Sequence, residues 1–419
     1  MEFHLDRTWS PHCAAPSGCD QYWVIPARPS ARVIDALGFL TIAAYGSWFY
    51  GFGVLVEDIS ADLGTGVGAL GAVYGVTTLA GGAGAVAVGR LLDRRGPRTV
   101  AGIIGPLASA AYALSSFIDD GAVFCAVFAI AGGAISASGF YSFTQPVAMS
   151  VRPDDTVRAV TRLTIWGAFA SPVMIPLTEV MRDAWGWRGA VRGTSVALFL
   201  VFALVASMTR TMAPVATGPV QPLRSVVRRA ASSPFLRWYA GSAMLSSAAI
   251  SSLLVFQVPV MKWAGLTAAA AASFAGARGL LQLFGRLPLV PLVARFGAWR
   301  LQFAGRAALV AGAAALWASG SAAAAVAYVI VVGASTGALA AVDGMVSREV
   351  LDGDSFATLM SMVGLVGTVG GALGPVGVGL LVQGTGSLGV VPAVVVVAAS
   401  ASVVAHVRAG LLRSAGVRP

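Results

Sequence analysis

Charged residues are scarce in this sequence. Only 11% of its 419 residues are Asp, Glu, Lys or Arg, whereas 57% are hydrophobic. The mean hydropathy is +0.79. Soluble domains carry about 25% charged residues, so the composition excludes a soluble globular protein. Lysine is nearly absent, since Lys262 is the only one, and the net charge of +10 therefore comes from arginine.

Residues that form disulfides, metal sites or catalytic centres are also rare. Three cysteines (Cys13, Cys19 and Cys125) are too few for a disulfide framework. The spacing of His12, Cys13 and Cys19 matches no zinc signature. The sequence also contains no serine elbow and no phosphate-binding loop. We therefore expect no metal, no cofactor and no enzymatic activity, and the sequence disfavours an energy-coupled pump.

Long apolar runs, in contrast, recur along the whole chain, and each is long enough for a membrane-spanning helix. Charged or turn-forming segments such as EDISADLG, DRRGPR, RPDD and RFGAWR separate them. These patterns predict an all-α integral membrane protein with twelve spans, at residues 33–56, 67–91, 99–118, 121–149, 158–182, 189–211, 235–261, 266–293, 300–319, 321–346, 356–382 and 388–408.

The distribution of arginine predicts the orientation of these spans. With the N-terminus inside, 22 of the 28 Lys and Arg residues fall at the inner ends and four at the outer ends. Inner loops of membrane proteins are rich in Lys and Arg, so both termini are expected in the cytoplasm. The same distribution argues against nucleic-acid binding, because the arginines lie in short clusters between apolar runs.

A polar stretch at 212–234 separates six spans from six. We predict a polar, Pro-rich cytoplasmic tail without a signal peptide at 1–32, an N-terminal six-helix bundle at 33–211 and a cytoplasmic linker at 212–234. A C-terminal six-helix bundle at 235–408 and a cytoplasmic tail at 409–419 complete the chain. Two halves with equal numbers of spans are typical of transporters that bind substrate between repeats, near the middle of the membrane.

The loop between the second and third spans, GRLLDRRGPR, carries a specific motif. It resembles the signature loop of the major facilitator superfamily in five residues: Gly89, Asp93, Arg94, Gly96 and Arg98. This resemblance implies two pseudo-symmetric six-helix bundles and a conformational latch on the inner side. Gly89 would let span two pass close to a neighbour. Asp93 would meet a helix N-terminus or an arginine in one conformation and leave it in the other.

The corresponding loop in the second half, VPLVARFGAWR, repeats part of this motif. Arg295, Gly297 and Arg300 are retained, whereas Ala294 replaces the acid. Such a decayed second copy supports an internal repeat.

Three further segments resemble bacterial members of the superfamily that are related to monocarboxylate and oxalate/formate carriers: YGSWFYGFGVLVEDISADLG, the motif loop, and PLTEVMRDAWGWRGA. In that group an arginine of span eight binds the substrate carboxylate, and Arg286 falls at this position. Gln282 stands where these carriers have an acid, and span one lacks their lysine. The resemblance therefore does not extend to their mode of proton coupling.

Span eight also carries polar residues on one face. Arg278, Gln282 and Arg286 are spaced by four residues, which places the arginines about 12 Å apart along the helix axis. An arginine at this depth must face protein or a water-filled cavity, where its charge attracts an anion such as a carboxylate. Alternatively, either arginine pairs with Asp343 or Asp35 and only ties helices together.

Other polar groups could line the same cavity. Tyr45 in span one, and Tyr141 and Gln145 in span four, are amphipathic, although aromatic residues more often serve packing or lie at the membrane interface. Asp35 and Asp343 are candidate proton carriers if transport is coupled to an ion.

These features predict a secondary active transporter that moves a small organic anion, with a carboxylate favoured, across the cytoplasmic membrane by alternating access. It would act as a monomer in the lipid bilayer, with protons as the candidate coupling ion. The alternative is proton-coupled efflux of a drug or hydrophobic metabolite by the same fold, for which an acid rather than an arginine would be indispensable. A membrane receptor or scaffold would normally add a substantial soluble domain.

Overall fold

The structure is a computed structural model that describes residues 31–216, 218, 220–351 and 353–415. Every regular element in this part of the chain is helical. Most of the predicted N-terminal tail, including His12, Cys13 and Cys19, lies outside the described residues.

The first six predicted spans are all helical, and several are built from two or three successive helical segments. In chain order these are α1 (Ala31–Ala44), the π-helical turn η1 (Tyr45–Tyr50), α2 (Gly51–Leu63), α3 (Val67–Arg95), α4 (Pro97–Thr99), the π-helical turn η2 (Val100–Ile104), α5 (Gly105–Ser115), α6 (Gly121–Gly139), α7 (Tyr141–Val151), the short η3 (Pro153–Asp155), α8 (Thr156–Ala168) and α9 (Ala170–Met208).

The remaining six predicted spans are helical as well. They comprise α11 (Pro234–Trp263), α12 (Ala268–Arg286), α13 (Leu289–Phe296), α14 (Ala298–Trp317), α15 (Ala322–Val350), the short η4 (Gly353–Ser355), α16 (Phe356–Thr385) and α17 (Val390–Ser414). The polar stretch before them, predicted only as a linker, contains one amphipathic helix, α10 (Leu223–Ser232).

Eight helical stretches among the described residues are each long and apolar enough to cross a membrane, and the pair α12–α13, bent by 55°, makes a ninth. Three more passes come from α4–η2–α5, from α14 and from the second part of α9. The chain reverses inside α9 at Gly186, whose φ of +67° is non-helical. A Cβ on Gly193 would lie 3.1 Å from the sulfur of Met181, so the two arms of α9 run side by side.

Capping side chains and glycines explain where the helices begin. Asp120 and Asp155 accept hydrogen bonds from the first N–H groups of α6 and α8, as N-cap residues do. Gly96 and Gly297 have φ values of +79° and +81°, a region in which L side chains are strained. These two glycines hold matching positions before the third and ninth passes, which supports the internal repeat.

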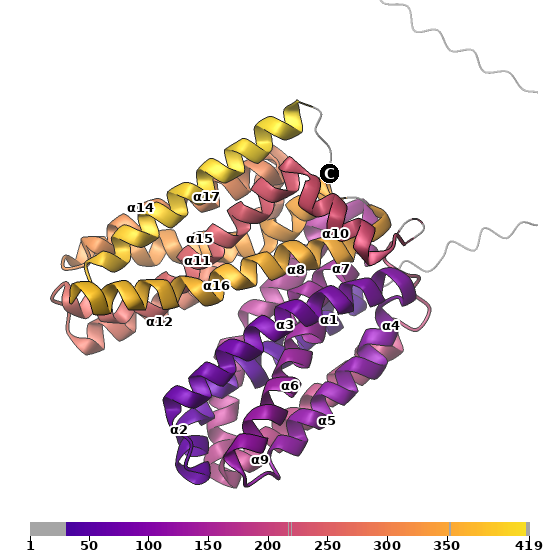
Figure 1. Cartoon of the computed structure of the whole chain (residues 1–419), viewed down its shortest axis with the longest axis horizontal. Coiled ribbons are helices and arrows are strands. Elements are labelled where there is room, and N and C mark those ends of the chain that lie inside the picture. Colours follow the sequence, from indigo (N-terminus) through magenta and orange to yellow (C-terminus); the bar gives the residue numbers. More distant parts are fainter. Residues whose placement is uncertain (1–30, 217, 219, 352, 416–419) are drawn as a thin grey trace, which may run out of the picture.

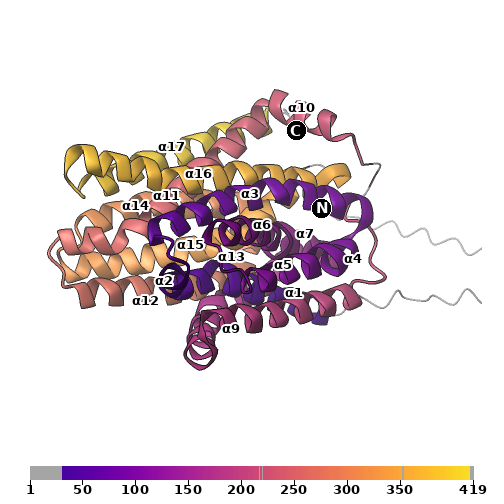
Figure 2. The same ribbon diagram turned by 60° about the horizontal axis from the view of Figure 1, so that its bottom comes forward.

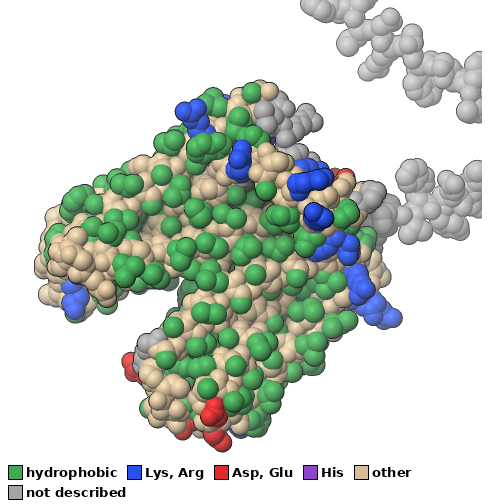
Figure 3. Space-filling model, viewed as in Figure 1, with side chains coloured by type: hydrophobic (Ala, Val, Ile, Leu, Met, Phe, Trp, Pro, Cys, Tyr) green, Lys and Arg blue, Asp and Glu red, His purple; other side chains and the backbone are tan. Residues whose placement is uncertain are grey.

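The helices form two lobes, with α1–α9 in the first and α11–α17 in the second (Figure 1). The lobes meet where α3 packs along α16 and where α8 contacts α12, α13 and α15. This contact lies at the end of the molecule that carries α4 and α10 (Figures 1 and 2). At the opposite end the lobes diverge, and the surface between them is hollowed (Figure 3).

Apolar packing closes the end at which the lobes meet. The hydrophobic core of the first lobe continues into the second through Ala341, Met345, Phe356 and Leu359. A separate hydrophobic core lies within the second lobe and includes Leu309 and Tyr328. Most of the Lys and Arg side chains visible in Figure 3 gather at the closed end. The cleft therefore opens on the side away from the arginine-rich loops.

Candidate functional site

Arg286 lies at the junction of the two lobes. It ends α12, just before the bend into α13, and its side chain is only 4% exposed. Its Nε donates to the carbonyl of Gly337 on α15 (3.3 Å), and its Nη1 donates to the carbonyl of Thr164 on α8 (2.6 Å). One guanidinium group therefore contacts both lobes through main-chain oxygens, and its charge has no carboxylate partner among the described residues.

The alternative in which Asp35 or Asp343 pairs with one of the span-eight arginines is wrong for this conformation. Asp35 accepts two hydrogen bonds from Arg162 (2.7 and 2.8 Å) and one from Trp166 (2.9 Å), all within the first lobe. Asp343 belongs to a separate group in the second lobe. The sequence does not show which helix faces meet, and the partners of these two acids could therefore not be predicted from it.

Arg278 occupies a second polar cluster, two turns before Arg286 on the same helix. Its Nε donates to Oε1 of Gln257 on α11 (3.1 Å), and the hydroxyl of Tyr328 on α15 donates to the same oxygen (3.0 Å). Arg278 is 8% exposed, and its Nη1 is buried without a hydrogen-bond partner. This nitrogen is an unused donor on a buried cation, so an anionic or carbonyl ligand would satisfy it.

Gln282 lies between the two arginines, as the spacing predicts, and is partly buried. Its main-chain oxygen packs directly against Gly337, where a Cβ would overlap with it. Close contact between α12 and α15 thus fixes the height of Arg286 relative to the carbonyl that it binds.

Tyrosines of the first lobe face this region. Tyr45 stacks on Phe140 with ring centroids 3.8 Å apart, and the ring of Tyr141 is 5.4 Å from that of Tyr45. Both phenols lie within electrostatic range of Arg286, and Tyr50 lies within range of Arg278. Partly buried tyrosines and two buried arginines therefore converge from opposite lobes.

Gln145 reaches across the junction. It is buried, and its Nε2 donates to the carbonyl of Ala340 on α15 (2.8 Å). In this conformation Gln145 contributes to the contact between the lobes.

The signature loop contributes a third contact between the lobes. The buried carboxylate of Asp93 accepts hydrogen bonds from the N–H groups of Ala357 (3.1 Å) and Thr358 (2.8 Å), and from the Thr358 hydroxyl (2.6 Å). It thus binds the N-terminus of α16, where main-chain donors and the helix dipole favour an anion. Gly89 permits this approach, since a Cβ there would lie 2.5 Å from the Ala357 carbonyl oxygen.

The other residues of the loop lie differently. Gly96 takes the positive φ that the turn into α4 requires. Arg94 and Arg98 are exposed at the closed end of the molecule.

Sequence reasoning missed a buried polar group in the second lobe. Arg306, one of the 22 basic residues expected at the inner ends of the spans, is 1% exposed inside α14. Its Nη1 donates to Ser242 Oγ (2.6 Å) and to His406 Nδ1 (2.8 Å). His406 therefore carries its proton on Nε2, which faces the Trp299 carbonyl at 3.3 Å. The signal available was an arginine within the apolar run FAGRAALVAG.

Asp343 supplies the negative charge beside this group. Its Oδ1 lies 3.8 Å from Arg306 Nη2 and accepts a hydrogen bond from Gln302 (2.7 Å). Although Asp343 lies within α15, its side chain is 53% exposed. Asp343 is thus a solvent-accessible carboxylate in loose contact with a buried arginine.

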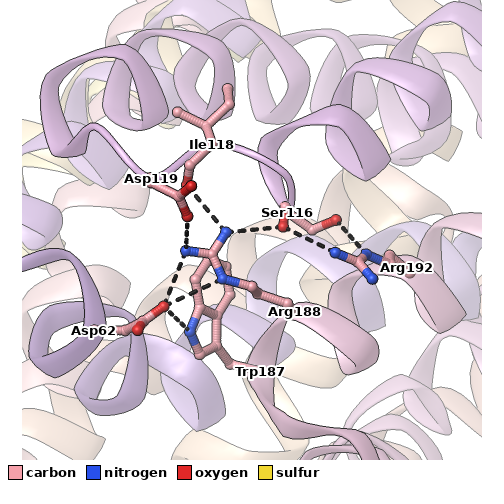
Figure 4. A network of polar contacts seen from close by, with 7 residues as sticks. All are labelled: Asp62, Ser116, Ile118, Asp119, Trp187, Arg188 and Arg192. Carbon is pink, nitrogen blue, oxygen red and sulfur yellow. Dashed lines mark hydrogen bonds and ion pairs between the residues drawn. The ribbon is translucent and has the colours of Figure 1, made fainter.

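A network at the open end braces the first lobe (Figure 4). Arg188 donates to the carboxylates of Asp62 (3.0 and 3.2 Å) and Asp119 (2.7 Å), and to the carbonyls of Ser116 and Ile118. The neighbouring Trp187 is buried and also donates to Asp62.

No group of three or more metal-ligating side chains occurs among the residues that the structure describes.

Residues 37–375 match the family described as Major Facilitator Superfamily. Among curated proteins, none matches the sequence. Similar solved structures include the transporter FucP in an outward conformation (TM-score 0.72, 13% identity, 90% of this chain and 97% of that chain). Another is the proton:xylose symporter XylE (0.68, 11%, 90% and 94%). A third is a bacterial homologue of the iron transporter ferroportin in an outward-facing state (0.71, 14%, 90% and 98%).

Proposed function

The chain belongs to the Major Facilitator Superfamily and is a membrane transporter rather than an enzyme, and we propose that its substrate is a small organic anion. We favour a carboxylate, carried across the cytoplasmic membrane by secondary active transport. In this proposal the bundles at 33–211 and 235–408 move against each other around the site between them. Both termini lie in the cytoplasm, as the arginine-rich loops at the closed end suggest.

One observation carries the proposed substrate class: two arginines of α12 are buried, Arg286 at the junction of the lobes and Arg278 in the second lobe, and neither has a carboxylate partner among the described residues. An uncompensated buried cation is costly, and an anionic ligand would offset that cost. Arg278 has an unused donor for this purpose. Arg286 would hold the carboxylate near Tyr45 and Tyr141, and Gln282 lies between the two arginines.

Closure around the anion would follow from the same charges. With the site empty, the like charges of Arg278 and Arg286 disfavour closure of the lobes around them, whereas a bound anion neutralises these charges. Arg286 already contacts Thr164 of the first lobe, so anion binding beside it would act directly on the junction. Asp93 would hold the inner side closed through α16 until the lobes exchange conformations.

Uptake or counterflow of a labelled carboxylate panel into proteoliposomes tests this proposal. We expect Arg286→Ala to abolish carboxylate transport, and Arg286→Lys to retain only a fraction because lysine lacks the planar fork. Arg158→Ala removes an exposed arginine of α8 and should leave transport unchanged. Unchanged carboxylate transport in both Arg286 variants would refute the proposal.

A second candidate, proton-coupled efflux of a hydrophobic compound, is favoured by Asp343. Its side chain is 53% exposed, so a proton can reach it, and protonation would remove its attraction to Arg306, 3.8 Å away. Under this alternative Asp343→Asn would abolish efflux, whereas Arg286→Ala would not.

A further inference from the structure

A pocket of about 600 Å³ lies on the first lobe, away from the cleft. It is formed where α4 and η2 pass the last turn of α9, at the end that carries the arginine-rich loops. Arg98 and Arg210 line it together with the hydroxyls of Thr99 and Ser207. Gly102 and Ile103 also line it.

The charge of this pocket is uncompensated. None of its lining residues is acidic, and the described chain provides no hydrogen-bond or ion-pair partner for the guanidinium groups of Arg98 and Arg210. Other arginines of the first lobe do have partners: Arg158 pairs with Asp155, and Arg162 with Asp35. The Ser207 hydroxyl already donates to the Leu204 carbonyl (2.7 Å). Two unpaired guanidinium groups beside the Thr99 hydroxyl form a site suited to a phosphate group, because guanidinium binds phosphate oxygens in a bidentate manner.

The surroundings of the pocket are apolar. Ile103 lines it and is 53% exposed, and Leu107 on the next turn of the same pass is also exposed. On the α9 side, Leu200 and Leu204 are exposed as well. In a membrane protein such side chains face the acyl chains of lipids. The ligand that fits is therefore anionic at one end and apolar at the other.

The second lobe does not repeat this arrangement. At the corresponding junction of α14 with α17, Trp299 stacks on His406 with ring centroids 4.1 Å apart. A Cβ on Gly410 would lie 3.2 Å from the Trp299 indole nitrogen, so the indole packs against α17. An aromatic side chain thus occupies the position at which the first lobe has Arg98. The basic pocket is therefore not a simple consequence of the internal repeat.

We propose that this pocket binds the headgroup of an anionic phospholipid of the inner leaflet, with its phosphate between Arg98 and Arg210. Basic pockets between membrane helices on the cytoplasmic side bind acidic headgroups through such contacts. The acyl chains would lie along Ile103 and Leu107 on one side and along Leu204 on the other.

Native mass spectrometry of the full-length protein, with lipid titrated into detergent, tests this proposal. We expect phosphatidylglycerol or cardiolipin to bind at least about tenfold more tightly than phosphatidylcholine. Arg98→Gln combined with Arg210→Gln should remove that preference, and Arg98→Lys with Arg210→Lys should restore most of it. Gly102→Leu keeps both charges but fills the pocket, so it should also weaken binding.

Two controls separate this site from general attraction by charge. Arg300→Gln with Arg408→Gln removes the same charge near the corresponding junction of the second lobe and should leave the preference within about twofold of the unmodified protein. Inorganic phosphate, added as a competitor, should not displace the lipid at equal concentration. The proposal would be overturned if the variant with glutamine at both Arg98 and Arg210 kept the preference for anionic lipid. It would also be overturned if the Arg300/Arg408 control variant lost this preference equally, or if inorganic phosphate displaced the lipid. Unchanged thermal unfolding verifies that each variant is folded.

Discussion

The substitution Asp93→Asn tests the contact between the signature loop and α16. The buried carboxylate accepts three hydrogen bonds from Ala357 and Thr358. Asparagine keeps one acceptor oxygen and turns an amide toward N–H donors. Hydrogen bonds to charged groups contribute about 1.5–3 kcal/mol each, and loss of a helix cap costs about 0.5–2 kcal/mol. We therefore expect the present conformation to lose about 2 kcal/mol relative to one in which α3 and α16 have separated.

A loss of that size changes the ratio of the two conformations by roughly 30-fold. Distances between spin labels at Ala61 and Gln383 measure the change, because these exposed positions lie on opposite lobes near the ends of α2 and α16. The three native cysteines would first be replaced by serine. We expect Asp93→Asn to increase the population with short distances, in which the cleft has closed.

Asp155→Asn provides the matched control. Asp155 also caps a helix, but its hydrogen bonds stay within the first lobe. It should leave the distance distribution unchanged. The reasoning fails if Asp93→Asn has no effect on the distances, or if Asp155→Asn shifts them equally.

Three further predictions follow from other contacts. Gly89→Ala places a Cβ 2.5 Å from a carbonyl oxygen of α16, so the same label distances should shorten. Asp343→Asn should abolish transport driven by a pH gradient while sparing counterflow; equal loss of both would exclude Asp343 as a proton carrier. Arg188→Ala removes contacts to two other segments of the first lobe, the end of α2 and residues 116–119, and should lower the free energy of unfolding by about 2–3 kcal/mol, measured by thermal unfolding. Arg192→Ala, which loses hydrogen bonds to Ser116 and a cation–π contact with Phe117 but no ion pair, should lower that free energy by less.

The membrane spans could be predicted from the sequence because each span is indicated by residues that are close together in the chain. A helix that crosses a bilayer needs about 20 apolar residues, and capping residues such as Asp120 mark where the next helix begins. The fold could likewise be predicted from the loop around Asp93 and its decayed copy near Gly297. The family match then confirmed the superfamily.

Partners of the buried charges could not be predicted in the same way. Arg286 binds a carbonyl 122 residues away, and Arg306 meets a histidine 100 residues away. In a membrane helix most faces are apolar, so periodicity does not reveal which face meets which neighbour. The sequence therefore does not show that Arg306 is buried, and it offers Asp343 as an alternative partner of Arg278 or Arg286 without indicating that Asp343 lies beside Arg306.

Ligand-induced thermal stabilisation of the purified protein tests the central claim most directly, because a ligand that binds the folded state raises its unfolding temperature. The panel would contain mono- and dicarboxylates of graded length together with neutral and cationic compounds matched in size. We predict that at least one carboxylate stabilises the unmodified protein, and that Arg278→Gln combined with Arg286→Gln removes this effect. Stabilisation by a neutral or cationic compound, equal in both proteins and without any response to carboxylates, would contradict the account.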